Sequence, residues 1–217
     1  MAHFTIIGLG RFGISACLEL IHLGHTVTGV DQDAKMVEKY VKNLTQAVIC
    51  DATDESALRE LDLDSSEAIL VAIGQDMQSS LLCTLALKNL GQKEIWVKAN
   101  TRAHHTIVSK LGVSRIIHPE EEMGMRVAQS LNYPMVNNYL AIGHDTYVVE
   151  IHVKESLQNR PLSHVLGNKH GTIKTLLVKR EQQLISQISD SFMLHENDIL
   201  LLCGTREELK YIAPRLV

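Results

Sequence analysis

The sequence predicts an α/β protein in which a doubly wound parallel sheet is followed by a small α+β domain. In the first part of the chain, short apolar runs alternate with amphipathic segments of helical length. These runs are continuously apolar, which is typical of parallel strands that helices cover on both faces. A glycine-rich segment joins the first run to the first helix. We therefore expect residues 1–132 to form one domain and residues 133–217 to form a second.

The strands and helices of the first domain follow each other in strict alternation. Strands are expected over residues 4–8, 26–31, 47–50, 68–72, 95–98 and 115–117. Helices are expected over residues 11–23, 34–42, 55–61, 78–90 and 103–111. Gly24 and Gly91 follow two of these helices, where a chain commonly needs a left-handed residue. Such alternation with right-handed crossovers gives a doubly wound sheet.

One further helix is expected over residues 120–131, after Pro119. Its apolar side chains cover more than one face; they include Met123, Met125, Val127 and Ala128. A helix that is wet on one side does not have this pattern. We expect either a partner subunit or packing within the chain to cover the second face.

The second domain has a different pattern. Tyr133-Pro134, with Asn137 and Asn138, predicts a linker. Beyond it we expect strands over residues 146–152, 172–178 and 199–203, and helices over residues 161–166 and 206–212. A domain this small, poor in convergent acid–base groups, does not look like the substrate domain of a dehydrogenase.

Composition excludes several classes of protein. A formal net charge of -4 gives no basic surface for nucleic acid. No segment approaches the roughly 18 unbroken apolar residues of a membrane span, and the N-terminus lacks a signal-peptide pattern. The four cysteines form no C-x-x-C pair, which favours buried thiols in a reducing compartment over a zinc site. We expect a cytoplasmic protein that reaches a membrane only through a partner.

The glycine-rich segment Gly8-Leu9-Gly10-Arg11-Phe12-Gly13 predicts the phosphate-binding turn of a Rossmann-like fold. Gly8 allows the tight turn, Gly10 lets a diphosphate approach the backbone, and Gly13 lets helix and strand pack closely. The helix N-terminus favours negative charge there. Asp31 ends the second strand, and its carboxylate can accept hydrogen bonds from both ribose hydroxyls while repelling a 2′-phosphate.

The other candidate binding residues follow the strands or lie within the loop. The carboxyl ends of parallel strands meet at one ligand crevice. The candidates from strand ends are Gln32, Asp51, Ala52, Ala72, Ile73, Gly74 and Lys98, and those from the loop are Arg11 and Phe12. Asp51 is expected in the adenine or ribose pocket, while Asp54 or Thr53 caps the next helix.

Three charged candidates are expected near the phosphates. The guanidinium of Arg11 can pair with phosphate oxygens, above all those of a third phosphate, although a solvated first-turn arginine is the alternative. Lys98 closes the fifth strand and can reach a terminal phosphate. The carboxylate of Glu120, after His-Pro, can bind a hard cation such as Mg²⁺; the alternative is an ordinary first-turn residue.

These segments together resemble the RCK family, the regulators of potassium conductance. The resemblance is carried by residues 8–13, 30–31, 50–53, 71–74, 97–99, 117–120 and 198–204. It spans nearly the whole chain and is nearest to the cytoplasmic regulatory subunits of bacterial Ktr- and Trk-type potassium uptake systems. Cys50 stands where many relatives carry glycine or asparagine.

This resemblance implies a protein that binds ATP or ADP and performs no catalysis. Dimers would assemble into an octameric ring that docks beneath a membrane-embedded potassium-transporting subunit, with ATP favouring the conducting state. Arg11 would contact the terminal phosphate, and Glu120 would take part in cation binding.

Two alternatives remain at this stage. An NAD(H)-binding oxidoreductase is favoured by the glycine turn and Asp31 alone, because Asp31 suits any unphosphorylated ribose. A redox-sensing Rossmann protein that regulates transcription would need a DNA-binding module. Whether the second domain binds its own ligand, such as a cyclic dinucleotide, stays open.

Overall fold

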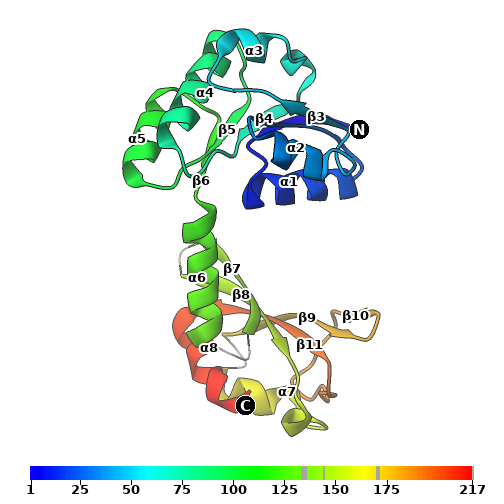
Figure 1. Cartoon of the computed structure of the whole chain (residues 1–217). Helices are drawn as coiled ribbons and strands as arrows, with labels where there is room; N and C mark the ends of the chain where they lie inside the picture. Colours follow the sequence, from blue (N-terminus) through cyan, green and yellow to red (C-terminus); the bar gives the residue numbers. More distant parts are fainter. Residues whose placement is uncertain (133–135, 144, 170–171, 217) are drawn as a thin grey trace. The chain divides into compact units, whose positions relative to one another are not determined.

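The protein is described by a computed structural model over residues 1–132, 136–143, 145–169 and 172–216. It divides into unit 1, Met1–Glu120, and unit 2, Glu121–Val217 (Figure 1). Helix α6 (Pro119–Asn132) spans this division. The functional boundary after residue 132 therefore stays a prediction.

Unit 1 is built on a six-stranded sheet in the order β3-β2-β1-β4-β5-β6. Its strands are β1 (His3–Ile7), β2 (Thr26–Asp31), β3 (Gln46–Ile49), β4 (Ala68–Val71), β5 (Ile95–Lys98) and β6 (Arg115–Ile117). Every pairing between them is parallel. The predicted doubly wound sheet is confirmed, with strand bounds that differ from the expected ones by at most one residue.

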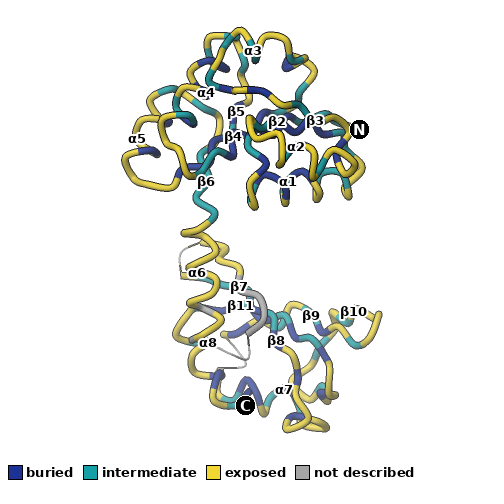
Figure 2. The backbone as a smooth tube through the Cα atoms, in the orientation of Figure 1, coloured by how far each residue is buried: buried dark blue, intermediate teal, exposed yellow. Residues whose placement is uncertain are grey.

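Helices cover both faces of this sheet (Figures 1 and 2). They are α1 (Arg11–His22), α2 (Ala34–Tyr40), α3 (Glu55–Arg59), α4 (Met77–Asn89) and α5 (Arg102–Lys110). One core joins the sheet to α3, α4 and α5 through Leu58, Leu87 and Val108. The other joins it to α1 and α2 through Cys17 and Val37. Burial on both faces explains why the strands are continuously apolar.

Local signals set the ends of these helices. Asp33, Asp54, Asp76 and Thr101 cap α2, α3, α4 and α5, each with a side-chain oxygen that accepts a backbone N–H bond. Gly24 and Gly91, with φ of 86° and 83°, follow α1 and α4 as predicted.

Unit 2 is a small α+β unit with an antiparallel sheet in the order β10-β9-β11-β8-β7. Its strands are β7 (Val136–Gly143), β8 (Thr146–His152), β9 (Lys174–Arg180), β10 (Gln183–Ile185) and β11 (Ile199–Thr205). Its further helices are α7 (Leu162–Leu166) and α8 (Arg206–Ile212). The described residues of both units together also form four short 3-10 turns, one of them, Leu63–Ser65, in unit 1. Ile151, Leu200 and Ile212 belong to its core.

The predicted linker is wrong in part. Tyr133 and Pro134 lie outside the described residues, but Asn137 and Asn138 belong to β7. This strand pairs with β8, and the register shifts between Val136 and Asn138. The ladder continues past this shift, so backbone pairing overrides the turn preference of asparagine. Three-residue β10 was missed because it is too short to show a period.

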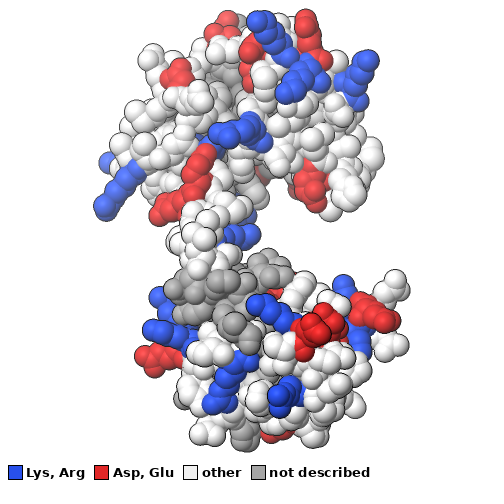
Figure 3. Space-filling view, turned by 60° about the horizontal axis from the view of Figure 1, so that its bottom comes forward, with Lys and Arg blue, Asp and Glu red and all other residues white. Residues whose placement is uncertain are grey.

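Two surface properties follow from the described residues. Met123, Met125, Val127 and Leu131 of α6 are at least half exposed. On the face drawn in Figure 3, basic and acidic side chains are interspersed rather than gathered by sign.

Among the described residues, no helix is long and apolar enough to cross a membrane.

Candidate functional site

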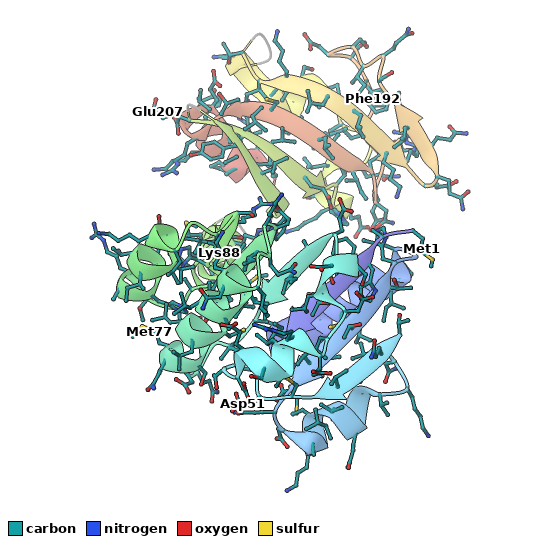
Figure 4. The ribbon with its side chains drawn as sticks, turned by 90° about the horizontal axis from the view of Figure 1, so that it is seen from above. Met1, Asp51, Met77, Lys88, Phe192 and Glu207 are labelled. Carbon is teal, nitrogen blue, oxygen red and sulfur yellow. The ribbon has the colours of Figure 1, made fainter. Side chains whose placement is uncertain are left out.

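A cleft of about 380 Å³ opens at the carboxyl ends of β1 to β4. Nine of the predicted binding residues line this carboxyl-end cleft: Gly8, Gly10, Asp31, Gln32, Asp51, Ala52, Ala72, Ile73 and Gly74. Figure 4 shows Asp51 and Met77, the first residue of α4, at one end of unit 1, with Lys88 farther along α4. The structure thus gathers four strand ends around one space, as parallel topology requires.

The glycine turn has the backbone geometry that its sequence predicts. Gly8 has φ of 97° and donates its N–H to the carbonyl of Val30 at 2.7 Å. A Cβ on Gly13 would lie 1.9 Å from the Gly8 oxygen, whereas a Cβ on Gly10 would meet nothing within 4 Å. Gly13 therefore permits strand–helix packing, while Gly10 leaves the cleft side of the backbone open to a ligand.

Asp31 holds the glycine turn as well as facing the cleft. Its Oδ2 accepts the Leu9 N–H at 2.7 Å, and its Oδ1 accepts the Asp33 N–H at 2.9 Å. Each carboxylate oxygen has two lone pairs, so both oxygens retain acceptor capacity for ribose hydroxyls. The carboxylate is therefore oriented by the backbone of the glycine turn, so the predicted sugar and phosphate contacts would be linked.

Asp51 is held in its charged form at the end of β3. Its Oδ1 accepts hydrogen bonds from the Thr53 hydroxyl at 2.7 Å and from the Thr53 N–H at 2.9 Å. These bonds hold the pKa of the Asp51 carboxyl below its usual range. A charged carboxylate here can accept from an amino group or a hydroxyl of a ligand.

The start of α4 supplies cleft residues that the sequence analysis missed. Gln75, Asp76 and Ser79 line the cleft. Asp76 accepts the Ser79 hydroxyl at 2.6 Å and its N–H at 3.2 Å. The available signal was the helix cap itself: an aspartate two residues after Gly74 must begin the helix at the crevice. Thr53 and Cys50, which also line the cleft, were not among the predicted site residues.

Lys98 and Glu120 lie beside this cleft rather than in its lining. Lys98 Nζ donates to Glu120 Oε1 at 2.5 Å, and the Lys98 side chain is only 9% exposed while that of Glu120 is 68% exposed. A Cβ on the cleft residue Gly74 would lie 3.0 Å from Lys98 Nζ. The ammonium also lies 5.6 Å from the centroid of the Phe12 ring.

The Glu120 carboxylate lies in the field of two positively charged side chains, Lys98 and Arg11. The hydrogen bond from Lys98 lowers the pKa of the Glu120 carboxyl; desolvation opposes this shift, and the charges of Lys98 and Arg11 add to it. Arg11 is exposed in the first turn of α1. Among the residues that the structure describes, no three acidic, histidine or cysteine side chains form a metal group. Because Mg²⁺ is usually held by one or two carboxylates together with phosphates and water, Glu120 fits such an ion beside a nucleotide.

Comparisons with known proteins agree with this architecture. The sequence model of the TrkA-N domain matches residues 4–119. The chain is 36% identical over 207 residues to Ktr system potassium uptake protein A of Bacillus subtilis (strain 168), covering 95% of this chain and 93% of that protein.

Solved structures show the same fold. The crystal structure of the GsuK RCK domain has a TM-score of 0.66 at 15% identity; the match covers 99% of this chain and 47% of that one. The GsuK channel bound to NAD has a TM-score of 0.62 at 13% identity, with 100% of this chain and 39% of that one covered. The chain thus spans less than half the length of these two solved chains.

Proposed function

The chain belongs to the TrkA-N domain family, and we propose that it binds ATP or ADP in the carboxyl-end cleft and thereby regulates a membrane-embedded potassium transporter. The observation that carries this proposal is the coupling of Asp31 to the glycine turn through the 2.7 Å bond from Leu9. A ribose acceptor and a phosphate turn are thereby built into one unit. This is the arrangement that a nucleotide with a free 2′-hydroxyl requires.

The proposed switch rests on the third phosphate. ATP and ADP can bias a two-state protein only through contacts that differ between its states. Arg11, at the start of α1, and Glu120, with a bound cation, are the groups that we assign to this difference. A tenfold shift requires about 1.4 kcal/mol, which one charge-assisted contact can supply. A cation there would neutralise phosphate charge, while Glu120 holds it in place.

Assembly and location belong to the same proposal. We infer that dimers form an octameric ring that docks on the inner face of the cell membrane through the transporter. Exposed Met123, Met125 and Val127 on α6 support self-association, because exposed apolar side chains favour burial against another chain. The relative from Bacillus subtilis, similar over 95% of this chain, is a potassium uptake protein by name.

Replacing Arg11 with alanine should weaken ATP binding about tenfold more than ADP binding, because only ATP offers the third phosphate to the guanidinium. Calorimetric titration with ATP, ADP and NADH, with and without Mg²⁺, measures this directly. Arg59→Ala is the matched control, since Arg59 is exposed on α3 and pairs with Glu55. Equal losses for both nucleotides would remove Arg11 from the proposed switch.

An NAD(H)-binding function is the alternative, favoured by Asp31, which suits any unphosphorylated ribose. The GsuK channel, which shares the fold, has been solved bound to NAD. Preference for NADH over ATP and ADP in the same titrations would move this alternative, as an oxidoreductase or a redox sensor, to first place. Recovery of ATP unchanged after incubation is expected if the protein acts by binding rather than by catalysis.

A further inference from the structure

The Lys98–Glu120 contact joins two groups to which the proposed function assigns different ligands. Lys98 is expected to meet a phosphate, and Glu120 is expected to hold a cation. In the structure these two groups instead form a hydrogen-bonded ion pair, with 2.5 Å between Nζ and Oε1. While this contact persists, the ammonium repels a cation that approaches Glu120, and the carboxylate repels a phosphate that approaches Lys98.

The buried position of Lys98 makes an anionic partner necessary. Its side chain is 9% exposed, between the Phe12 ring of the glycine turn and the backbone of Gly74. An ammonium removed from water requires a compensating charge, and removing that charge alone is strongly destabilising. Lys98 can therefore release Glu120 only when another anion takes its place. The adjacent cleft at Gly74 is where a phosphate would arrive.

Glu120 is subject to the complementary constraint. Its side chain is 68% exposed, so a cation from solvent can reach it. A divalent ion binds carboxylate oxygen at about 2.0–2.6 Å, so an ion on either oxygen of Glu120 would lie close to the ammonium that already donates to Oε1. Like charges so close also repel each other. Cation binding at Glu120 is therefore favoured when the Lys98 ammonium turns to another acceptor.

We propose that Lys98 is the built-in counter-ion of Glu120, and that the two residues exchange their mutual contact for a nucleotide phosphate and a divalent cation in one coupled step. This inference deepens the proposed function, on which it rests, by assigning positive coupling between nucleotide and cation to one residue pair. Lys98 is here a positioning residue for the cation site. Because Glu120 lies in the first turn of α6, the exchange acts on the helix that spans both units.

The proposed exchange predicts that removing the charge of Lys98 strengthens cation binding at Glu120. Nucleotide-free protein is titrated with Mn²⁺ in a calorimeter. Lys98→Gln should bind Mn²⁺ about tenfold more tightly than the wild type, and a change of this size lies within the usual range of coupling free energies. Lys98→Gln/Glu120→Gln should lose this gain, and Lys110→Gln, an exposed lysine on α5, should behave as wild type. Unchanged or weaker Mn²⁺ binding by Lys98→Gln would overturn the proposal.

The nucleotide side is tested with ADP in the presence of a chelator. Glu120→Gln should bind ADP about tenfold more tightly than wild type, because it frees the Lys98 ammonium for phosphate. In the Lys98→Gln background, Glu120→Gln should change ADP binding little. If the gain persisted in that background, simple repulsion between carboxylate and phosphate would explain it, and the exchange would be wrong. Glu121→Gln, on the same helix turn, is the control.

The two proposals can fail separately. If wild-type protein bound neither ATP nor ADP, the proposed function would fall, while Mn²⁺ titration without nucleotide would still decide whether Lys98 competes at Glu120. Folding of every variant is checked through Trp96, the single tryptophan of the chain, which lies two residues before Lys98 on β5. A lower melting temperature is expected for Glu120→Gln, because Lys98 loses its counter-ion. An unchanged emission spectrum at the titration temperature is therefore what every variant must show before affinities are compared.

Discussion

Gly13→Ala is expected to destabilise unit 1 by about 3 kcal/mol or more and to abolish nucleotide binding, because overpacking against backbone is the severe case. The new Cβ would lie 1.9 Å from the Gly8 oxygen, 3.1 Å from the Gly8 carbonyl carbon and 3.2 Å from the Ala72 Cβ. No side-chain rotation relieves a clash with backbone. Either α1 must move away from β1 or the glycine turn must open, and both changes displace the proposed phosphate site.

Thermal unfolding followed by Trp96 fluorescence, together with ADP titration, measures both effects. Gly124→Ala is the stability control, since its Cβ would meet nothing within 4 Å in α6 and alanine favours a helix. Gly10→Ala separates binding from folding: its φ of -63° suits alanine and its Cβ has room, so only ligand approach should suffer. A Gly13→Ala protein with wild-type stability would contradict the packing role assigned to this glycine.

Asp198→Asn is expected to destabilise unit 2 by about 3–5 kcal/mol, the range for breaking a buried ion pair on one side. Asp198 is 1% exposed, and its carboxylate accepts from Arg180 Nε at 2.8 Å and Nη2 at 2.7 Å. It also accepts the His195 N–H at 2.8 Å. Asparagine removes the negative charge and turns an N–H group toward the guanidinium, which stays 29% exposed and loses its counter-ion.

The same carboxylate should make unit 2 sensitive to acid. Burial by itself raises the pKa of Asp198, but the Arg180 and His195 hydrogen bonds and the nearby positive charge lower it on balance. A pKa depressed in the folded state gives stability that is fully present above the unfolded value of about 3.9. This contribution is lost as pH falls through the folded pKa, and Asp198→Asn should lack that dependence.

Amide hydrogen exchange of β9 and β11 reports on this unit, and calorimetric unfolding at pH 7 and pH 3 gives the pH dependence. Glu181→Gln, which neutralises an exposed carboxylate next to Arg180 in sequence, is the control. Loss of stability in Glu181→Gln comparable with that in Asp198→Asn would point to general charge balance instead of the buried pair.

Local sequence patterns were sufficient for the architecture of unit 1. Continuous apolar strands, helix caps and the glycine turn each depend on residues close together in the chain, so the doubly wound sheet, its helices and the strand ends that line the cleft could be predicted. The turn at Gly8, Gly10 and Gly13 is the clearest case, because its backbone needs are met by residue type alone. Asp31 could be predicted as a cleft residue because it ends the second strand.

Other features depend on pairing between distant segments, and these needed the tertiary structure. β7 forms although Asn137 and Asn138 favour turns, because β8 supplies backbone hydrogen-bond partners. Asp76 and Ser79 are a different case: the helix cap was a local signal for them, and the sequence analysis did not use it.

The sequence by itself determined a doubly wound sheet, the glycine turn and the set of charged candidates. Only the tertiary structure decided that Lys98 and Glu120, 22 residues apart, form an ion pair beside Gly74, and that the buried Asp198 pairs with Arg180. The physical reason is that periodicity and capping report on a residue's own segment. Which charge meets which depends on how separate segments pack, and burial then determines how strongly the charges interact.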